Sequence, residues 1–230
     1  NPVFTPDGAI VFESAAASFR DLYRARAGEA PSRLTDDPEG NFEPSPFPDG
    51  SLAFTSSRDG DAEIYKIDAR GRAPRRLTRS PGEDLSPRVS PDGRRVAFLS
   101  TRTGADRVWV MGPDGESPRP VRRRAAQGEE EREHTWSSDG QSLAFVARAP
   151  GGKARVLLWN ARTDEVSELT DGRSVDDMPA FSPDGRYLAF VSDRGGEPDV
   201  WIMRADGSGA VRAAARPARR WLPRWARRSP

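Results

Sequence analysis

The stretch Pro87-Arg88-Val89-Ser90-Pro91-Asp92-Gly93 decides the fold, because variants of it recur along the chain at a regular spacing. In each copy a short apolar run follows an Asp-Gly pair, as residues 96–99 do here. The pairs are 42, 43, 47 and 45 residues apart, at Asp7-Gly8, Asp49-Gly50, Asp92-Gly93, Asp139-Gly140 and Asp184-Gly185. A repeat of about 40–45 residues with four short strands is typical of a β-propeller.

The third repeat shows how one copy would form a four-stranded blade. Residues 88–90 form a short strand that ends at Pro91-Asp92-Gly93, where Pro presets φ and Gly takes a positive φ. Residues 95–100 are apolar at consecutive positions, which indicates a strand covered on both faces. Residues 108–111 supply a third strand, and residues 119–121 a short outer strand whose Pro protects the sheet edge. The sequence therefore predicts an all-β fold of four-stranded blades.

We expect one propeller domain over residues 1–230. Five full repeats have the approximate bounds 1–39, 40–82, 83–129, 130–174 and 175–218, and a partial sixth covers 219–230. The sixth begins with Pro223-Arg224-Trp225, which matches the start of an inner strand, but the Asp-Gly turn does not follow. A six-blade type of ring is favoured, and a five-blade ring is the alternative. The chain begins with Asn rather than Met, so no signal peptide can be read from it.

The repeat resembles that of the TolB-like propeller family, which carries WD-repeat-like Pro-Asp repeats. The resemblance lies in Ser-Pro-Asp-Gly-Arg-x-x-Ala-Phe-x-Ser-x-Arg-x-Gly-x-x-x-Val-Trp, found at residues 90–109 and 182–201, and it extends over nearly the whole chain. It implies a non-catalytic scaffold that binds a protein or peptide in the bacterial envelope, periplasmic or secreted. The same resemblance leaves open a propeller that belongs to a larger peptidase or glycan-active enzyme, with catalysis outside this chain. A propeller that binds a small ligand is a third hypothesis.

The composition argues against catalysis within this chain. There is no Cys, which excludes disulfides and thiolate metal sites, and the single histidine, His134, excludes a multi-His metal centre. No Gly-x-Ser-x-Gly nucleophile elbow occurs. His134 stands where other repeats have Pro44, Pro87 and Pro179, and we expect it to be a loop residue without a catalytic role. We therefore predict no enzyme activity, no cofactor and no metal.

Charge and hydropathy limit the partners. The net charge is +1, but seven Arg and no acid follow Asp206. A basic patch with Trp residues would suit nucleic acid, yet Trp225 matches the inner-strand positions of Trp136 and Phe181 and is expected in a core. No run approaches the roughly 18 apolar residues of a membrane span. We predict a monomer with no nucleic-acid partner and no membrane span.

A polar residue recurs three positions before the inner-strand proline or its equivalent, and radial repetition would gather these residues at one mouth of the channel. The loop leading to each inner strand should carry them, with the hairpins of Arg58, Arg102 and Arg194 further out. The predicted partner-binding residues at this mouth are Asn41, Asp84, Arg88, Glu131, His134 and Asp176. The alternative is that the acids cap loops or bridge blades without binding anything.

Overall fold

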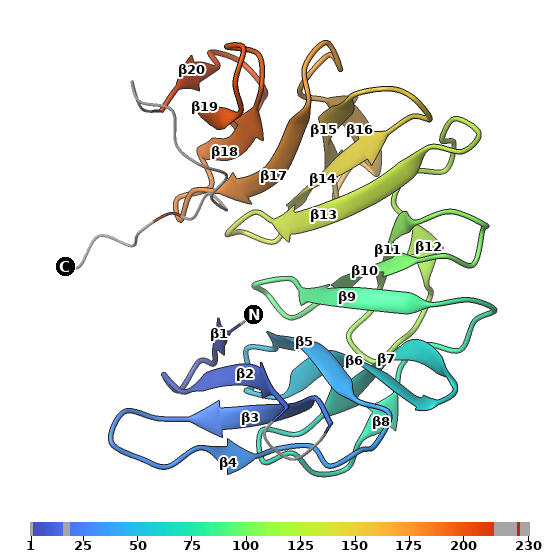
Figure 1. Ribbon diagram of the computed structural model, residues 1–230, viewed down its shortest axis with the longest axis vertical. Helices are drawn as coiled ribbons and strands as arrows, with labels where there is room; N and C mark the ends of the chain where they lie inside the picture. The colour runs from blue at the N-terminus through green and yellow to red at the C-terminus, as the bar shows by residue number, and fades with distance from the viewer. Residues whose placement is uncertain (1, 16–18, 214–224, 226–230) are drawn as a thin grey trace. The chain divides into compact units, whose positions relative to one another are not determined.

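The computed structural model describes residues 2–15, 19–213 and 225, and it confirms the all-β prediction. In this part of the chain the strands form five four-stranded antiparallel sheets, and within each sheet they lie in chain order (Figure 1). The described residues include no helix long and apolar enough to cross a membrane.

Each sheet consists of an inner strand, two middle strands of five to eight residues and a short outer strand. The first sheet contains β1 (Val3–Phe4), β2 (Ile10–Ser14), β3 (Asp21–Ala25) and β4 (Ser32–Arg33). The second and third sheets contain β5 (Asn41–Pro46), β6 (Leu52–Asp59), β7 (Asp61–Ile67), β8 (Arg75–Arg76), β9 (Asp84–Val89), β10 (Val96–Ser100), β11 (Arg107–Met111) and β12 (Arg119–Pro120). The fourth and fifth contain β13 (Glu130–Trp136), β14 (Ser142–Arg148), β15 (Ala154–Asn160), β16 (Glu165–Glu168), β17 (Asp176–Phe181), β18 (Tyr187–Ser192), β19 (Asp199–Arg204) and β20 (Val211–Arg212).

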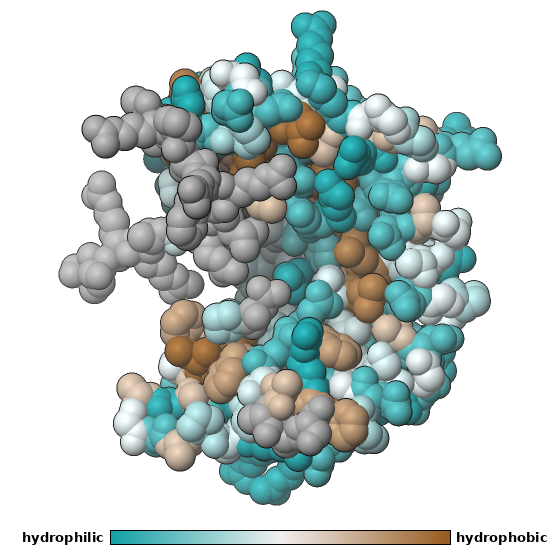
Figure 2. Space-filling model, viewed as in Figure 1, coloured by the Kyte–Doolittle hydropathy of each residue, from teal (hydrophilic) through white to brown (hydrophobic). Residues whose placement is uncertain are grey.

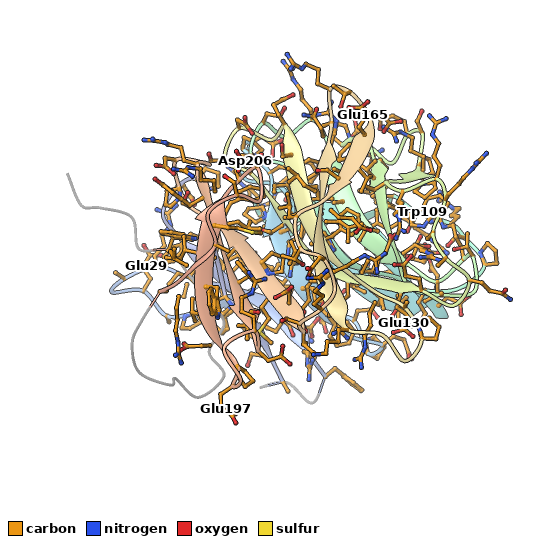
Figure 3. The ribbon with its side chains drawn as sticks, turned by 90° about the horizontal axis from the view of Figure 1, so that it is seen from above. Glu29, Trp109, Glu130, Glu165, Glu197 and Asp206 are labelled. Carbon is orange, nitrogen blue, oxygen red and sulfur yellow. The ribbon has the colours of Figure 1, made fainter. Side chains whose placement is uncertain are left out.

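The chain consists of two compact units. The first comprises Asn1–Gly104 with Trp109–Arg119, and the second comprises Ala105–Val108 with Pro120–Pro230. Charged side chains such as Glu29, Glu165 and Glu197 project from turns and outer strands (Figure 3), and hydrophilic groups dominate the face seen in Figure 2. This surface agrees with a composition of 35% hydrophobic residues.

The predicted Asp-Gly turn joins each inner strand to the next strand. In the third sheet the Gly93 amide donates to the Ser90 carbonyl at 2.8 Å, and Gly93 has a φ of 71°. The Ser90 hydroxyl donates to the Asp92 carboxylate at 2.6 Å, and that carboxylate accepts the Arg94 amide at 3.1 Å. A short polar side chain that bonds the backbone two residues on explains why Asp occupies this position.

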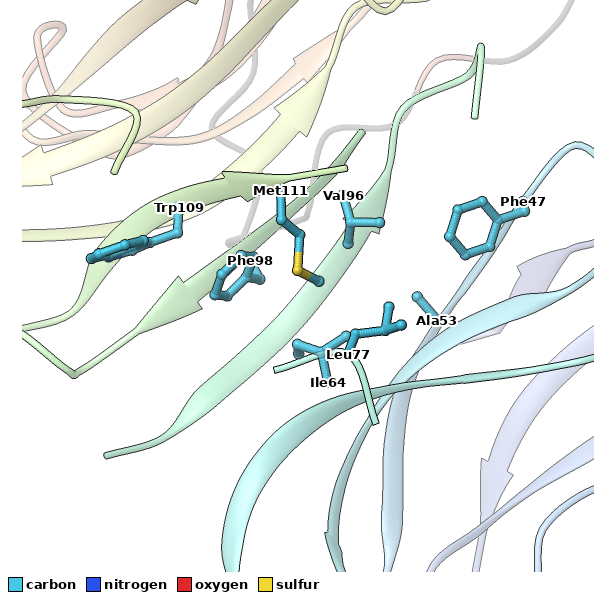
Figure 4. Close-up of a cluster of buried hydrophobic side chains, with 8 residues drawn as sticks. All are labelled: Phe47, Ala53, Ile64, Leu77, Val96, Phe98, Trp109 and Met111. Atoms are coloured by element: carbon cyan, nitrogen blue, oxygen red, sulfur yellow. The ribbon is translucent and has the colours of Figure 1, made fainter. Parts of the chain in front are cut away.

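The core lies between successive sheets of each unit. Figure 4 shows one such layer, in which Ala53 and Ile64 of the second sheet face Phe98, Trp109 and Met111 of the third. In the second to fifth sheets, the phenylalanines of the second strands, Phe54, Phe98, Phe145 and Phe190, are all 0% exposed. A fully buried ring of this size contributes roughly 1.5–3 kcal/mol. The second sheet shows the predicted cause of such consecutive apolar positions, since the first sheet packs on one face of it and the third sheet on the other.

A bulge that the sequence did not predict interrupts four inner strands. It leaves the residue before Pro44, Pro87, His134 and Pro179 in a left-handed conformation. The φ angles are 54°, 53°, 50° and 55° at Glu43, Ser86, Glu133 and Met178. Non-glycine residues rarely adopt this conformation.

The predicted partial sixth repeat, residues 219–230, lies outside the described residues except for Trp225. The indole of Trp225 donates to the Ala180 carbonyl of β17 at 2.9 Å. The domain bounds and the number of blades in the ring stay predictions.

Candidate binding site

A Ser-x-Arg sequence at the end of the second strand builds a clamp in the third sheet. Arg102 donates from Nη2 to Asp84 Oδ2 at 2.6 Å and from Nε to Ser100 Oγ at 2.8 Å. Its guanidinium lies 4.3 Å from the centre of the Trp109 ring. One arginine thus ties the inner, second and third strands of the sheet together.

The second and fifth sheets repeat this clamp. Arg58 donates to Asn41 at 2.9 Å and to Ser56 at 3.0 Å, and it lies over Tyr65. Arg194 donates to both Asp176 and Ser192 at 2.9 Å and lies over Trp201.

The clamps explain where most of the predicted site residues lie. Asn41, Asp84 and Asp176 are each the first residue of an inner strand and are 0% exposed. The expectation of loop positions with the arginines further out is therefore wrong, because the same arginines hold these side chains inside the sheets. Direct contact of the three residues with a partner stays a prediction.

Glu131 is held by different groups. It lies in β13, is 1% exposed, and accepts the Val108 amide at 3.0 Å. Arg107 and Arg122 lie 3.7 and 3.6 Å from its carboxylate. Burial raises the pKa of Glu131, against the opposing effect of the amide and the two arginines.

The other two predicted residues, Arg88 and His134, lie in different units, and the expectation that His134 is a loop residue is wrong, because it lies within strand β13. Arg88 is half-buried in β9, in the first unit, and donates to the Pro87 carbonyl at 2.9 Å. His134 is 6% exposed in β13, in the second unit. Partner binding by Arg88 and His134 stays a prediction too.

The fourth sheet departs from the repeat, since it has no Ser-x-Arg clamp. Ala147 and Ala149 stand where the third sheet has Ser100 and Arg102. Between them, Arg148 is exposed and donates to the Gly152 carbonyl at 3.2 Å. Within the described residues Arg148 forms no ion pair.

A groove of about 300 Å³ lies between the fourth and fifth sheets at this point. Two arginines, two aspartates and four apolar side chains line it: Arg132, Arg148, Asp177, Asp193, Val175, Met178, Val191 and Pro198. We call it the 4–5 groove. Apolar walls with a few polar groups are typical of ligand sites.

A pair of carboxyl groups stands beside the 4–5 groove. The Glu133 carboxyl hydrogen-bonds the Asp177 carboxyl and accepts the Met178 amide at 2.8 Å. Arg132 donates to Asp177 at 3.1 Å. Burial, followed by the adjoining Asp177 carboxyl, raises the pKa of Glu133 to about 7. At neutral pH the two carboxyl groups therefore share one proton in a large fraction of the molecules.

The chemistry of this site suits binding. In the described part of the chain, no group of three His, Cys, Asp or Glu residues is placed to hold a metal ion. The 4–5 groove offers apolar walls, two guanidinium groups and two aspartates, and beside it stands Glu133, whose charge changes near neutral pH.

Sequence reasoning missed Glu133, Asp177 and Met178. The sequence did offer one indication of Glu133: it directly precedes His134, the equivalent of the inner-strand proline. The bulge at this position turns the glutamate side chain towards the next sheet. Glu43 shows the same relation in the first unit, since it accepts the Ser86 amide at 2.8 Å. Glu13, from the second strand β2, accepts the Glu43 amide at 2.9 Å.

Comparisons with known proteins agree with the fold. A family model described as "TolB beta propeller domain" matches residues 30–156 and 134–229. The Tol-Pal system protein TolB of Anaeromyxobacter dehalogenans is 33% identical over 91 residues, which cover 39% of this chain and 20% of that protein. An uncharacterized protein of Agrobacterium fabrum is 34% identical over 93 residues, which cover 39% of this chain and 30% of that protein. The matches thus span less than a third of either relative.

Two solved structures extend the comparison to most of the chain. TolB from Acinetobacter baumannii is similar with a TM-score of 0.72 and 30% identity, over 90% of this chain and 52% of that one. A puromycin-hydrolyzing peptidase from Mycobacterium tuberculosis is similar with a TM-score of 0.74 and 20% identity, over 94% of this chain and 37% of that one. The second likeness concerns the fold alone. Together the comparisons confirm the predicted propeller fold.

Proposed function

Because the chain belongs to the TolB β-propeller domain family, we propose that it is a non-catalytic scaffold that holds a protein or peptide segment. Relatives named as Tol-Pal system proteins support a place in the bacterial cell envelope, periplasmic or secreted. The chain spans about half of the TolB structure it resembles, so the partner of the whole protein belongs to the proposal.

The observation that carries the proposal is the 4–5 groove. It lies beside the fourth sheet, which lacks the clamp that the second, third and fifth sheets have, and it is lined by apolar side chains and by an arginine without an ion pair among the described residues. The clamps elsewhere turn the equivalent polar groups inward, where they stabilise the sheets. The site expected from sequence at Asn41, Asp84 and Asp176 would require their clamps to open.

A peptide display library tests the proposal. Peptides selected on the wild-type chain should bind it in solution, and Val175→Trp should weaken that binding at least tenfold, because the larger side chain fills the groove. Val175 is 38% exposed, so the change should not disturb the core. Val211→Trp is the matched control, since Val211 is 60% exposed on the outer strand β20. Failure to select any peptide, or equal binding by the two variants, would contradict the proposal.

The alternative, a propeller attached to a peptidase or glycan-active enzyme, makes a different prediction. Peptide or oligosaccharide substrates would then be cleaved by the full-length protein, through a domain outside this chain. Assays of the full-length protein with peptide p-nitroanilides and with pectic oligosaccharides decide between the two, since the scaffold should leave both unchanged.

A further inference from the structure

We propose that the 4–5 groove binds a peptide segment with an arginine or lysine next to an apolar residue, whose cation lies against the carboxyl groups of Glu133 and Asp177. This inference rests on the proposed function, since it names the class of segment that the scaffold would hold.

The charged groups at the 4–5 groove nearly balance. Two guanidinium groups, of Arg132 and Arg148, face three carboxyl groups, of Glu133, Asp177 and Asp193. The neighbouring Asp176 is already neutralised by Arg194 at 2.9 Å. The groove is thus neutral while a proton bridges Glu133 and Asp177, and it carries one negative charge when that proton leaves. A single cation restores neutrality.

The Glu133–Asp177 pair lies beside the groove. Glu133 comes from the fourth sheet and Asp177 from the fifth, and their carboxyl groups meet beside the groove. Met178 and Asp177 line the groove and both contact Glu133, so a group in the groove lies next to the shared proton. Two ionised carboxylates in contact repel each other, and a guanidinium or ammonium between them would remove that repulsion while forming charge-assisted hydrogen bonds.

The apolar walls of the 4–5 groove favour a ligand with a long apolar stem. Val175, Met178, Val191 and Pro198 give the groove apolar walls. Lys and Arg have apolar stems that pack on such walls while the charged head reaches a polar group. A bare ammonium or metal ion would leave these walls unused, which favours a side chain with a stem and an adjacent apolar residue.

The binding should therefore depend on pH. A carboxyl with a pKa of about 7 is ionised in about one molecule in eleven at pH 6 and in about ten in eleven at pH 8. If the cation binds only the ionised pair, its affinity should rise about tenfold between these two pH values.

The test uses the acetylated and amidated dipeptide Leu-Arg as the probe, titrated into the chain by isothermal calorimetry or NMR at pH 6, 7 and 8. We expect about tenfold tighter binding at pH 8 than at pH 6. The same dipeptide with citrulline, which is neutral and nearly isosteric, should bind at least tenfold more weakly at pH 8. Glu133→Gln keeps an oxygen for the Met178 amide but should abolish the pH dependence and weaken binding at pH 8.

Glu165→Gln is the matched control, since it removes the same charge from the exposed start of β16 and should behave as wild type. If Glu133→Gln does not fold, Asp177→Asn gives the same test from the other side of the pair. Affinity that does not change with pH, equal binding of citrulline, or unchanged binding by a folded Glu133 variant overturns the inference. If library peptides still bind in the groove while the dipeptide does not, the inference fails and the scaffold function stands.

Discussion

Trp109 illustrates how much a single residue contributes to this fold. It is 9% exposed and packs with Phe98 and Met111 between the second and third sheets. Trp109→Ala should lower the free energy of unfolding by roughly 3–5 kcal/mol, the range for removing a large buried aromatic side chain. Phe4→Ala is the control, because Phe4 is 74% exposed and should cost under about 1 kcal/mol. Urea denaturation measures both, and equal losses would contradict the packing described.

Gly93 and Arg94 are adjacent in the turn, but their substitution should affect the melting temperature very differently. Gly93 has a φ of 71°, and a Cβ atom there would lie 2.9 Å from Pro48 Cδ. Gly93→Val should therefore lower the melting temperature by several degrees, because a β-branched residue resists this conformation and the added carbon meets the proline. Arg94→Ala should change it little, since the Arg94 amide that bonds Asp92 is retained. Thermal unfolding followed by circular dichroism compares them, and matching melting temperatures would refute the turn.

At the scale of the element, the Ser-x-Arg clamp is the unit that holds a sheet together. Arg102→Ala leaves the carboxylate of Asp84, which is 0% exposed, without its cation. Removing one partner of a buried ion pair costs roughly 3–5 kcal/mol. Adding Asp84→Asn to Arg102→Ala should recover part of that loss, because the buried charge is then gone. A double-mutant cycle in urea measures the coupling, and additive losses would show that the two side chains do not interact.

The sheets and their clamps differ in how well the sequence predicts them. The Asp-Gly turns and the consecutive apolar positions predict the sheets, because both signals are local. The clamps were harder to predict, since Asp84 and Arg102 are far apart in sequence, and a carboxylate read as exposed proved to be neutralised inside the sheet. The bulge at Glu133 has no local sequence signal beyond the residue that follows, and the pair with Asp177 depends on contact between two sheets.

At the scale of the whole molecule, the Glu133–Asp177 pair should make stability depend on pH. The pKa of Glu133 is about 7 in the folded protein against 4.5 ordinarily, so between these pH values the folded state holds a proton that the unfolded state releases. Stability should therefore fall as pH rises through this window. In Glu133→Gln the melting temperature should fall less between pH 5 and pH 8 than in wild type. Scanning calorimetry at both pH values tests this, with Glu165→Gln as the control that should keep the wild-type slope.

The glutamate contacts at the inner-strand bulges have a consequence for how the chain folds. Glu13 bonds the bulge amide of the second sheet, Glu43 that of the third, and Glu133 that of the fifth. In these three pairs of successive sheets, the earlier sheet thus supplies an acceptor for the amide of the residue that adopts a rare backbone conformation in the later one. In the nearest-neighbour description of repeat proteins, these bonds belong to the interface energy rather than to the intrinsic energy of a repeat. A sheet would then gain its native inner strand only once its predecessor has formed, so that within each unit order would spread from the earlier sheet to the later one.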